Sequence, residues 1–229
     1  MLNLYRLLLR TARNSNRGGF TLVELLVVIG IIAILAGVAL GPITRGIKQA
    51  QESGSMQVTR QVGLAEFSYS NDYNQTYPFA ATSEALASTL LNGGYVTDPS
   101  VFYIASTPSS SKPSGLTAPY TLAKANVNFD FMCGSAAGAS GLTSTAADGT
   151  PLVELTGGTY TMKTTGPITC TLNSTLTAFG TDGLAVDYKS NSAKFLKAVI
   201  TGATSATIAN FVDTSYNDPS GGSYALVTP

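Results

Sequence analysis

A single glutamate, Glu24, is the only charged residue in the apolar stretch from Phe20 to Ile43. A stretch of this length is long enough for a helix to cross a membrane. A carboxylate inside such a helix is costly to bury unless a cationic group pairs with it. No Lys or Arg follows before Arg45, so the nearest available cation is a new amino terminus at Phe20. The lone glutamate therefore predicts that the chain is cut between Gly19 and Phe20.

The segment before this bond is basic. Residues 1–19 contain Arg6, Arg10, Arg13 and Arg17 and no acidic residue. Positively charged flanks stay in the cytoplasm, so the rest of the chain is expected on the outer side of the membrane. The pattern predicts a leader peptide at 1–19 that is removed by cleavage.

This region has two other interpretations. A secretory signal cut near Gly37-Val38-Ala39 is disfavoured, because its apolar core would be too long and would contain Glu24. A plain amino-terminal membrane anchor needs about 20 apolar residues and remains an alternative.

The residues around the bond are Gly19, then Phe20-Thr21-Leu22-Val23-Glu24-Leu25, then a long apolar run. From Arg17 to Leu40 this sequence resembles the class III signal of type IV pilins and of the pseudopilins of type II secretion. The resemblance implies cleavage after Gly19 by a prepilin peptidase and methylation of the Phe20 amine. It also implies that Glu24 pairs with such an amine as subunits assemble into a helical filament. An inner-membrane platform protein and an assembly ATPase are the further partners that it implies.

Residues 20–72 predict one long helix. Its first part, 20–43, is apolar on all sides, as expected of a transmembrane segment. Gly41-Pro42 is expected to weaken or kink it, since proline lacks an amide donor. Its second part is amphipathic, with charged residues such as Glu66 on the solvent-facing sides. The apolar stripe expected to pack on a sheet consists of Ile43, Ile47, Ala50, Gly54, Val58, Val62, Ala65 and Tyr69.

Residues 73–229 predict a β-rich globular domain outside the cytoplasm. A short helix is expected near Leu86–Leu91, and the remainder alternates short β-like runs with turns rich in Gly, Pro, Ser and Thr. The expected fold is α+β, a long N-terminal helix packed on a C-terminal antiparallel sheet, as in pilins. The predicted strands are Val101–Ala105, Val127–Met132, Leu152–Leu155, Gly158–Lys163, Ile168–Leu172, Ala185–Tyr188, Thr207–Val212 and Tyr224–Val227, with Lys194–Ile200 as a strand or a short helix.

Cys133 and Cys170 are the only cysteines. An even number of cysteines outside the cytoplasm favours a disulfide, and two buried free thiols are the alternative. The chain has no histidine, the commonest general base, and no Walker loop, nucleophile elbow or zinc pattern. These absences predict that the protein is not an enzyme.

Asp213, Asn217 and Asp218 precede a glycine-rich tail and offer the oxygen ligands that Ca²⁺ prefers. The resemblance to major pseudopilins, which bind Ca²⁺ in their carboxy-terminal loops, favours this group over Asp182 and Asp187. Solvated turn residues are the alternative interpretation, so Ca²⁺ is expected only as a candidate cofactor.

Net charge bears on the partners. Removing the four leader arginines from 13 basic residues leaves nine against 13 acidic residues. A mildly acidic chain is not expected to bind nucleic acid, which requires clustered Lys and Arg. A minor pilin for DNA uptake would need a basic patch that this charge does not suggest.

The sequence therefore predicts a structural subunit of a type IV filament, either a pilin or a pseudopilin. It would be stored in the inner membrane as a single-pass subunit, with its C-terminal domain outside, and then join a pilus or pseudopilus with other copies of itself. The alternative is a membrane-anchored extracellular binding or enzymatic domain that uses a pilin-like signal.

Overall fold

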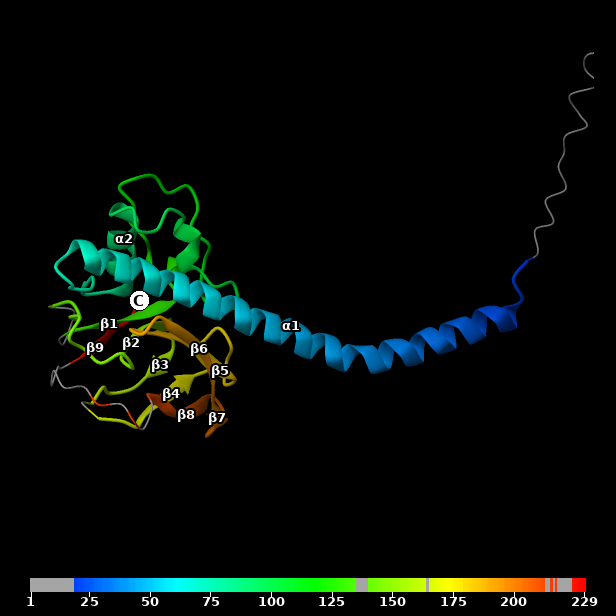
Figure 1. Ribbon diagram of the computed structural model, residues 1–229. Coiled ribbons are helices and arrows are strands. Elements are labelled where there is room, and N and C mark those ends of the chain that lie inside the picture. Colours follow the sequence, from blue (N-terminus) through cyan, green and yellow to red (C-terminus); the bar gives the residue numbers. More distant parts are fainter. Residues whose placement is uncertain (1–18, 135–139, 164, 213–214, 216, 218–223) are drawn as a thin grey trace, which may run out of the picture. The chain divides into compact units, whose positions relative to one another are not determined.

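The computed structural model describes residues 19–134, 140–163, 165–212, 215, 217 and 224–229 (Figure 1). The chain is of the α+β class, a long helix followed by antiparallel sheets, as predicted. It divides into two compact units, and the boundary falls between Lys48 and Gln49, inside the first helix. The C-terminal half of this helix thus belongs to the same unit as the sheets.

Helix α1 (Leu22–Asp72) begins in the first unit as a segment long and apolar enough to cross a membrane. The helix continues through Pro42, so the expected weakening or kink there does not break it. The hydroxyl of Thr44 donates to the carbonyl oxygens of Leu40 (3.1 Å) and Gly41 (2.9 Å) in the same turn. These are side-chain bonds to carbonyls one turn back and do not replace the amide that proline lacks, whose helical acceptor would be the carbonyl of Val38.

In the second unit, one face of α1 is buried, and it is more polar than predicted. Val62 and Ala65 of the predicted stripe are buried, and Val58 and Tyr69 are half-buried. Glu66, predicted on the solvent side, is only 1% exposed, so that prediction is wrong. Small side chains allow helix and sheet backbones to approach closely, which brings the neighbouring Glu66 into the core as well. The buried positions are Ser55, Thr59, Val62, Gly63, Ala65, Glu66 and Ser70.

Gly63 lies where α1 closely approaches Asp187 of β5, and its substitution tests this packing. A Cβ built on Gly63 would overlap the carboxylate of Asp187. We expect Gly63→Ala to destabilise the domain by about 1–3 kcal/mol through overpacking. Gly54→Ala, in the same helix with open space around it, is the matched control and should be stabilising by up to about 1 kcal/mol. Urea unfolding of both variants checks this, and equal effects at the two glycines would contradict it.

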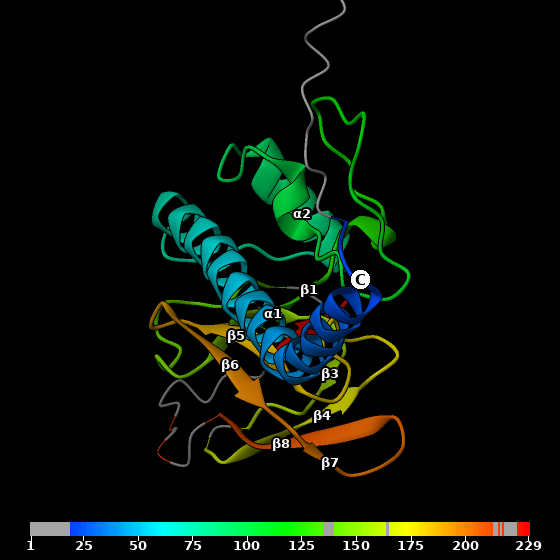
Figure 2. The same ribbon diagram turned by 90° about the vertical axis from the view of Figure 1, so that its right-hand side faces the viewer.

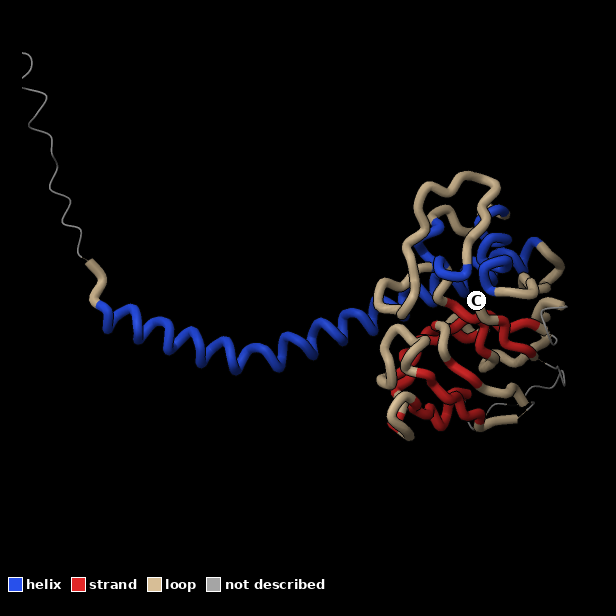
Figure 3. The backbone as a smooth tube through the Cα atoms, turned by 180° about the vertical axis from the view of Figure 1, so that it is seen from behind, coloured by secondary structure: helices blue, strands red, loops and turns tan. Residues whose placement is uncertain are grey.

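Helix α2 (Ser83–Asn92) confirms the predicted short helix and buries Leu86, Leu90 and Leu91. The predicted strand at Val101–Ala105 is wrong. A 3₁₀ helix, η1 (Pro99–Phe102), starts there because the Asp98 carboxylate caps it by accepting from the Ser100 amide at 2.8 Å. A second 3₁₀ helix, η2, spans Lys124–Asn126. In Figure 3, α2 and the 3₁₀ helices lie on one side of the strands.

The strands form two antiparallel sheets, and the lower strands in Figure 2 belong to the second of them. The first sheet has the order β6-β5-β2-β1-β9, with β1 (Phe129–Cys133), β2 (Pro151–Leu155), β5 (Gly183–Tyr188), β6 (Ser192–Lys197) and β9 (Ala225–Val227). The second has the order β3-β4-β8-β7, with β3 (Gly158–Thr159), β4 (Ile168–Asn173), β7 (Val199–Ile200) and β8 (Ser205–Val212). Apart from the first, each predicted strand thus overlaps an observed one, and Lys194–Ile200 is β-structure.

The two cysteines are free thiols in the structure, in place of the predicted disulfide. Cys133 lies on β1 and Cys170 on β4, so they belong to different sheets. Both are fully buried in the hydrophobic core. Burial raises the pKa of Cys133 to about 11 and raises that of Cys170 further. They therefore pack as small apolar side chains, the alternative that the sequence left open.

Candidate functional site

The bond between Gly19 and Phe20 lies in a non-helical segment directly before α1. Both residues are exposed, and the Phe20 side chain is 85% exposed. A Cβ built on Gly19 would meet nothing within 4 Å. Exposed backbone that makes no helical hydrogen bonds is the preferred substrate of proteases. The geometry of this segment therefore suits proteolytic processing.

Thr21 and Glu24 form a capping box at the start of α1. The amide and the hydroxyl of Thr21 both donate to Glu24 Oε2 at 2.9 Å. The Glu24 amide donates in return to Thr21 Oγ1 at 3.2 Å. This reciprocal arrangement starts the helix after Thr21, so the Gly19–Phe20 bond stays outside it.

The capping role of Glu24 was missed from the sequence. Thr-x-x-Glu before an apolar run is a recognised capping signal, and Thr21-Leu22-Val23-Glu24 has that spacing. In the described part of the chain, Glu24 has no cationic partner, and its contacts are to Thr21. The carboxylate therefore remains available to an amine from outside this helix.

The apolar segment of α1 is uncovered. Every large apolar side chain from Phe20 to Ile43 is between 47% and 85% exposed. Contiguous apolar surface of this extent requires lipid or other apolar helices around it. The side chains are Phe20, Leu22, Val23, Leu25, Leu26, Val27, Val28, Ile29, Ile31, Ile32, Ile34, Leu35, Val38, Leu40 and Ile43.

The proposed Ca²⁺ ligands lie mostly outside the described residues. Asp213 and Asp218 are outside them, and Asn217 forms an isolated β-bridge with Thr165. Among the described residues, no group of three or more His, Cys, Asp or Glu side chains is placed to hold a metal ion. Of the weaker pair, Asp182 is exposed and Asp187 is buried. Calcium binding thus stays a prediction.

The core of the second unit holds four carboxyl groups that the sequence did not place there: Glu66, Asp130, Glu154 and Asp187, each 1% exposed. Asp130 and Glu154 are directly opposite each other on β1 and β2. Burial raises the pKa of Asp130 to about 7, and burial followed by the charge of Asp130 raises that of Glu154 well above its usual range. Only the strand register brings this pair together.

The other two carboxyl groups, Glu66 of α1 and Asp187 of β5, also repel each other. Burial, then the charge of Asp187, raises the pKa of Glu66 well above its usual range. Burial raises the pKa of Asp187 to about 7, although the positive charge of Arg60 opposes the shift. These groups lie where α1 meets the sheet.

Residues 14–40 match the family model of the prokaryotic N-terminal methylation motif, the signal of type IV pilins and pseudopilins. The match contains the Gly19–Phe20 bond, the capping box and most of the exposed apolar segment. The predicted resemblance is thereby confirmed over this part of the chain. No curated protein and no solved structure matches the chain. The motif therefore identifies a prepilin-peptidase type of substrate and leaves the globular domain without a relative to compare.

Proposed function

We propose that this protein is a structural subunit of a type IV filament, a pilin or a type II secretion pseudopilin. Prepilin peptidase cuts it between Gly19 and Phe20, and the Phe20 amine is methylated. The observation that carries the proposal is a methylation motif joined to a capped helix whose apolar side chains are uncovered. A folded domain of its own follows, as a filament surface requires.

The apolar segment gives the mechanism of assembly. In the inner membrane, lipid covers the side chains between Phe20 and Ile43, and the basic leader holds the amino terminus in the cytoplasm. A platform protein and an ATPase extract the subunit into the filament. Extraction does not expose this surface to water, because helices of neighbouring subunits replace the lipid.

Glu24 supplies the selectivity of that step. In the single subunit, its carboxylate accepts hydrogen bonds from Thr21. In the apolar interior of a filament, the carboxylate and a cleaved amino terminus would each be costly to bury alone. Their pairing removes both costs and fixes the axial position of one subunit against the next.

The processing step is tested by intact mass and amino-terminal sequencing of the protein from cells with and without prepilin peptidase. We expect a chain that begins at methylated Phe20 only when the peptidase is present. A chain that begins at Met1 in both strains, or after Ala39, would overturn the proposal and leave an anchored or secreted domain.

A further inference from the structure

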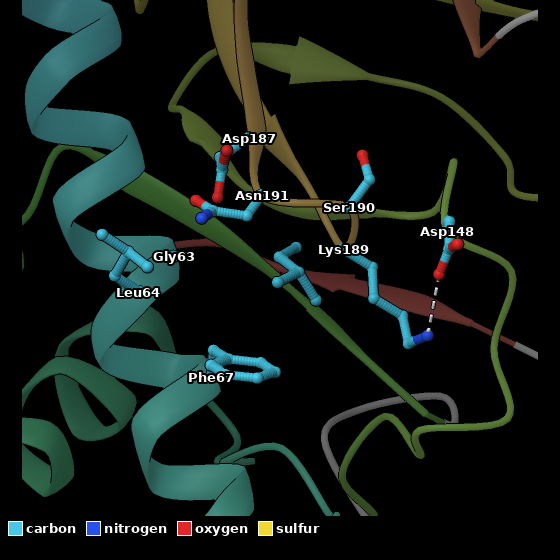
Figure 4. A pocket seen from close by; sticks show the side chains of 9 residues that line it. Gly63, Leu64, Phe67, Asp148, Asp187, Lys189, Ser190 and Asn191 are labelled. Atoms are coloured by element: carbon cyan, nitrogen blue, oxygen red, sulfur yellow. Dashed lines mark hydrogen bonds and ion pairs between the residues drawn. The ribbon is translucent and has the colours of Figure 1, made fainter.

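A pocket of about 370 Å³ lies in the second unit between the C-terminal half of α1 and the end of β5 (Figure 4). Its size lies within the range of small-ligand sites. Leu64 and Phe67 of α1 and Leu152 of β2 provide apolar walls, and Phe67 points from the helix into the pocket. Leu64 and Phe67 are 42% and 48% exposed, so nothing in the described chain covers these walls.

Asp187 gives this apolar pocket a carboxylate. The residue lines the pocket and is only 1% exposed, and neither carboxylate oxygen makes a hydrogen bond of good geometry in the described part of the chain, although the Tyr188 amide is close enough to lower its pKa. A buried carboxylate normally has several donors, because an unsatisfied one is costly. Two acceptor atoms without a well-formed hydrogen bond, beside apolar walls, favour a further donor from outside the chain.

The two cations near Asp187 make their direct contacts with other residues, although the charge of Arg60 still lowers the pKa of Asp187. Lys189 Nζ lies 3.3 Å from Asp148 Oδ1, and this ion pair is on the side of the pocket away from Asp187 (Figure 4). Arg60 Nε donates to Asn191 Oδ1 at 3.2 Å. Glu66 also faces Asp187 from α1 and adds negative charge when ionised. Neither cation forms an ion pair with Asp187 among the described residues, so its carboxylate can accept one from an incoming group.

We infer that this pocket binds an ammonium or guanidinium group on an apolar stem. The cationic group reaches Asp187 and donates to its free oxygens, and the stem packs between Leu64, Phe67 and Leu152. The ring of Phe67 adds a cation–π contact of the kind that favours such groups. This chemistry comes either from a free alkylamine or from a basic side chain of a second copy of the chain. Binding of the cation in this pocket does not depend on filament assembly.

Protonation of Asp187 gives the site a specific pH dependence. Burial raises the pKa of Asp187 to about 7, and the charge of Arg60, followed by a hydrogen bond from the Tyr188 amide, opposes the shift. A cation binds the ionised form of Asp187, so the affinity of the cation should rise from pH 6 to pH 8. Below the pKa of Asp187, the rise should be up to about tenfold for each pH unit. A ligand held by apolar contacts alone would bind equally at both pH values.

The test uses the full chain in detergent micelles, with n-butylguanidinium and n-butylammonium as probes and neutral 1-butanol as their isostere. Calorimetric titration should show saturable binding of both cations and little of 1-butanol. We expect Asp187→Asn to weaken cation binding by about tenfold or more. Glu52→Gln, which removes an equal charge from α1 outside the pocket lining and leaves the Lys189–Asp148 ion pair intact, is the matched control and should change affinity by less than about threefold.

A second measurement identifies the source of the cation. If a second copy supplies it, sedimentation should show self-association that butylguanidinium competes away and Asp187→Asn abolishes. If the probes bind but neither butylguanidinium nor the Asp187→Asn substitution changes self-association, the natural ligand of the site is a free amine. The inference would be overturned if 1-butanol bound as tightly as the cations, or if Asp187→Asn bound the cations as tightly as the wild type. It would also be overturned if neither probe bound and no self-association depended on Asp187.

The folding of Asp187→Asn is checked by circular dichroism. If that variant does not fold, Phe67→Ala replaces it, because the half-exposed ring can be truncated with little effect on the core. Weaker cation binding in Phe67→Ala, together with the rise in wild-type affinity from pH 6 to pH 8, then supports the site. Unchanged binding in Phe67→Ala or a flat pH profile contradicts it.

Discussion

Glu24→Val should abolish or strongly impair filament formation and leave cleavage after Gly19 intact. The substitution removes the carboxylate that a cleaved amino terminus needs when both are buried among apolar helices. The bond that the peptidase cuts lies outside the helix and keeps its exposure. Filaments sheared from cells would be counted by electron microscopy, and cleavage would be followed as the mass loss of the leader.

Glu24→Gln separates the charge of Glu24 from its role in the cap. Glutamine retains an oxygen that can accept from the amide and hydroxyl of Thr21, since Gln also occupies this position in capping boxes. It carries no charge to pair with an amine. If pairing is the function, Glu24→Gln should fail to assemble as Glu24→Val does. Normal filament yield from Glu24→Gln would show that the cap, and not the charge, is what assembly requires.

The local part of the site was predictable from the sequence, because the interactions that form it are local. The apolar run and the acid-free leader are contiguous in sequence, and Glu24 lies three residues after Thr21. The strands on both sides of the turns were also found, since alternation and turn residues act over a few positions. The 3₁₀ helix at Pro99 was missed because an Asp98 cap outweighs a short β-like run.

The buried polar groups were not predictable, because they depend on contacts between distant segments. Periodicity placed Glu66 in solvent on the assumption that charged residues face water, yet the sheet covers it. Asp130 and Glu154 meet only through the register of β1 with β2. Asp187 reaches α1 because a glycine at position 63 leaves room for it. A sequence pattern contains none of these pairings, so it did not reveal the pocket or the acid pair.

The acid pair predicts an unusual dependence of stability on pH. The folded state binds a proton at Asp130 more tightly than the unfolded chain does, because burial raises its pKa from 3.8 to about 7. The stabilisation that this bound proton provides is therefore fully present below about pH 4 and is lost as pH rises through 7. Above that pH, the contribution of Asp130 to stability no longer changes. The loss from Asp130 alone is on the order of 4 kcal/mol, at 1.36 kcal/mol for each pKa unit.

Glu154 adds to this loss in the same direction, since its pKa is also raised by burial and by the charge of Asp130. The two carboxyl groups are adjacent, so they titrate as a pair, and their effects on stability are not independent. Removing one ionisable group is thus expected to reduce the repulsion on the other. The double replacement Asp130→Asn with Glu154→Gln removes the part of the pH dependence that this pair contributes, whereas Glu66 and Asp187 keep theirs.

Urea unfolding of the full chain in detergent at pH 4.5, 6 and 8 measures this effect. The wild-type midpoint should fall as pH rises, whereas the double variant should fall less, because only Glu66 and Asp187 still contribute to the loss, and it should exceed the wild type at pH 8. Asn at 130 retains an oxygen for the Gly157 amide, which donates to Asp130 Oδ2 at 3.3 Å, so the fold should tolerate the change. Asp148→Asn, at a largely exposed carboxylate, should follow the wild-type profile. A wild-type midpoint that rises with pH would show that the folded protein lowers the pKa values of its carboxyl groups, contrary to the burial that the structure gives Asp130 and Glu154.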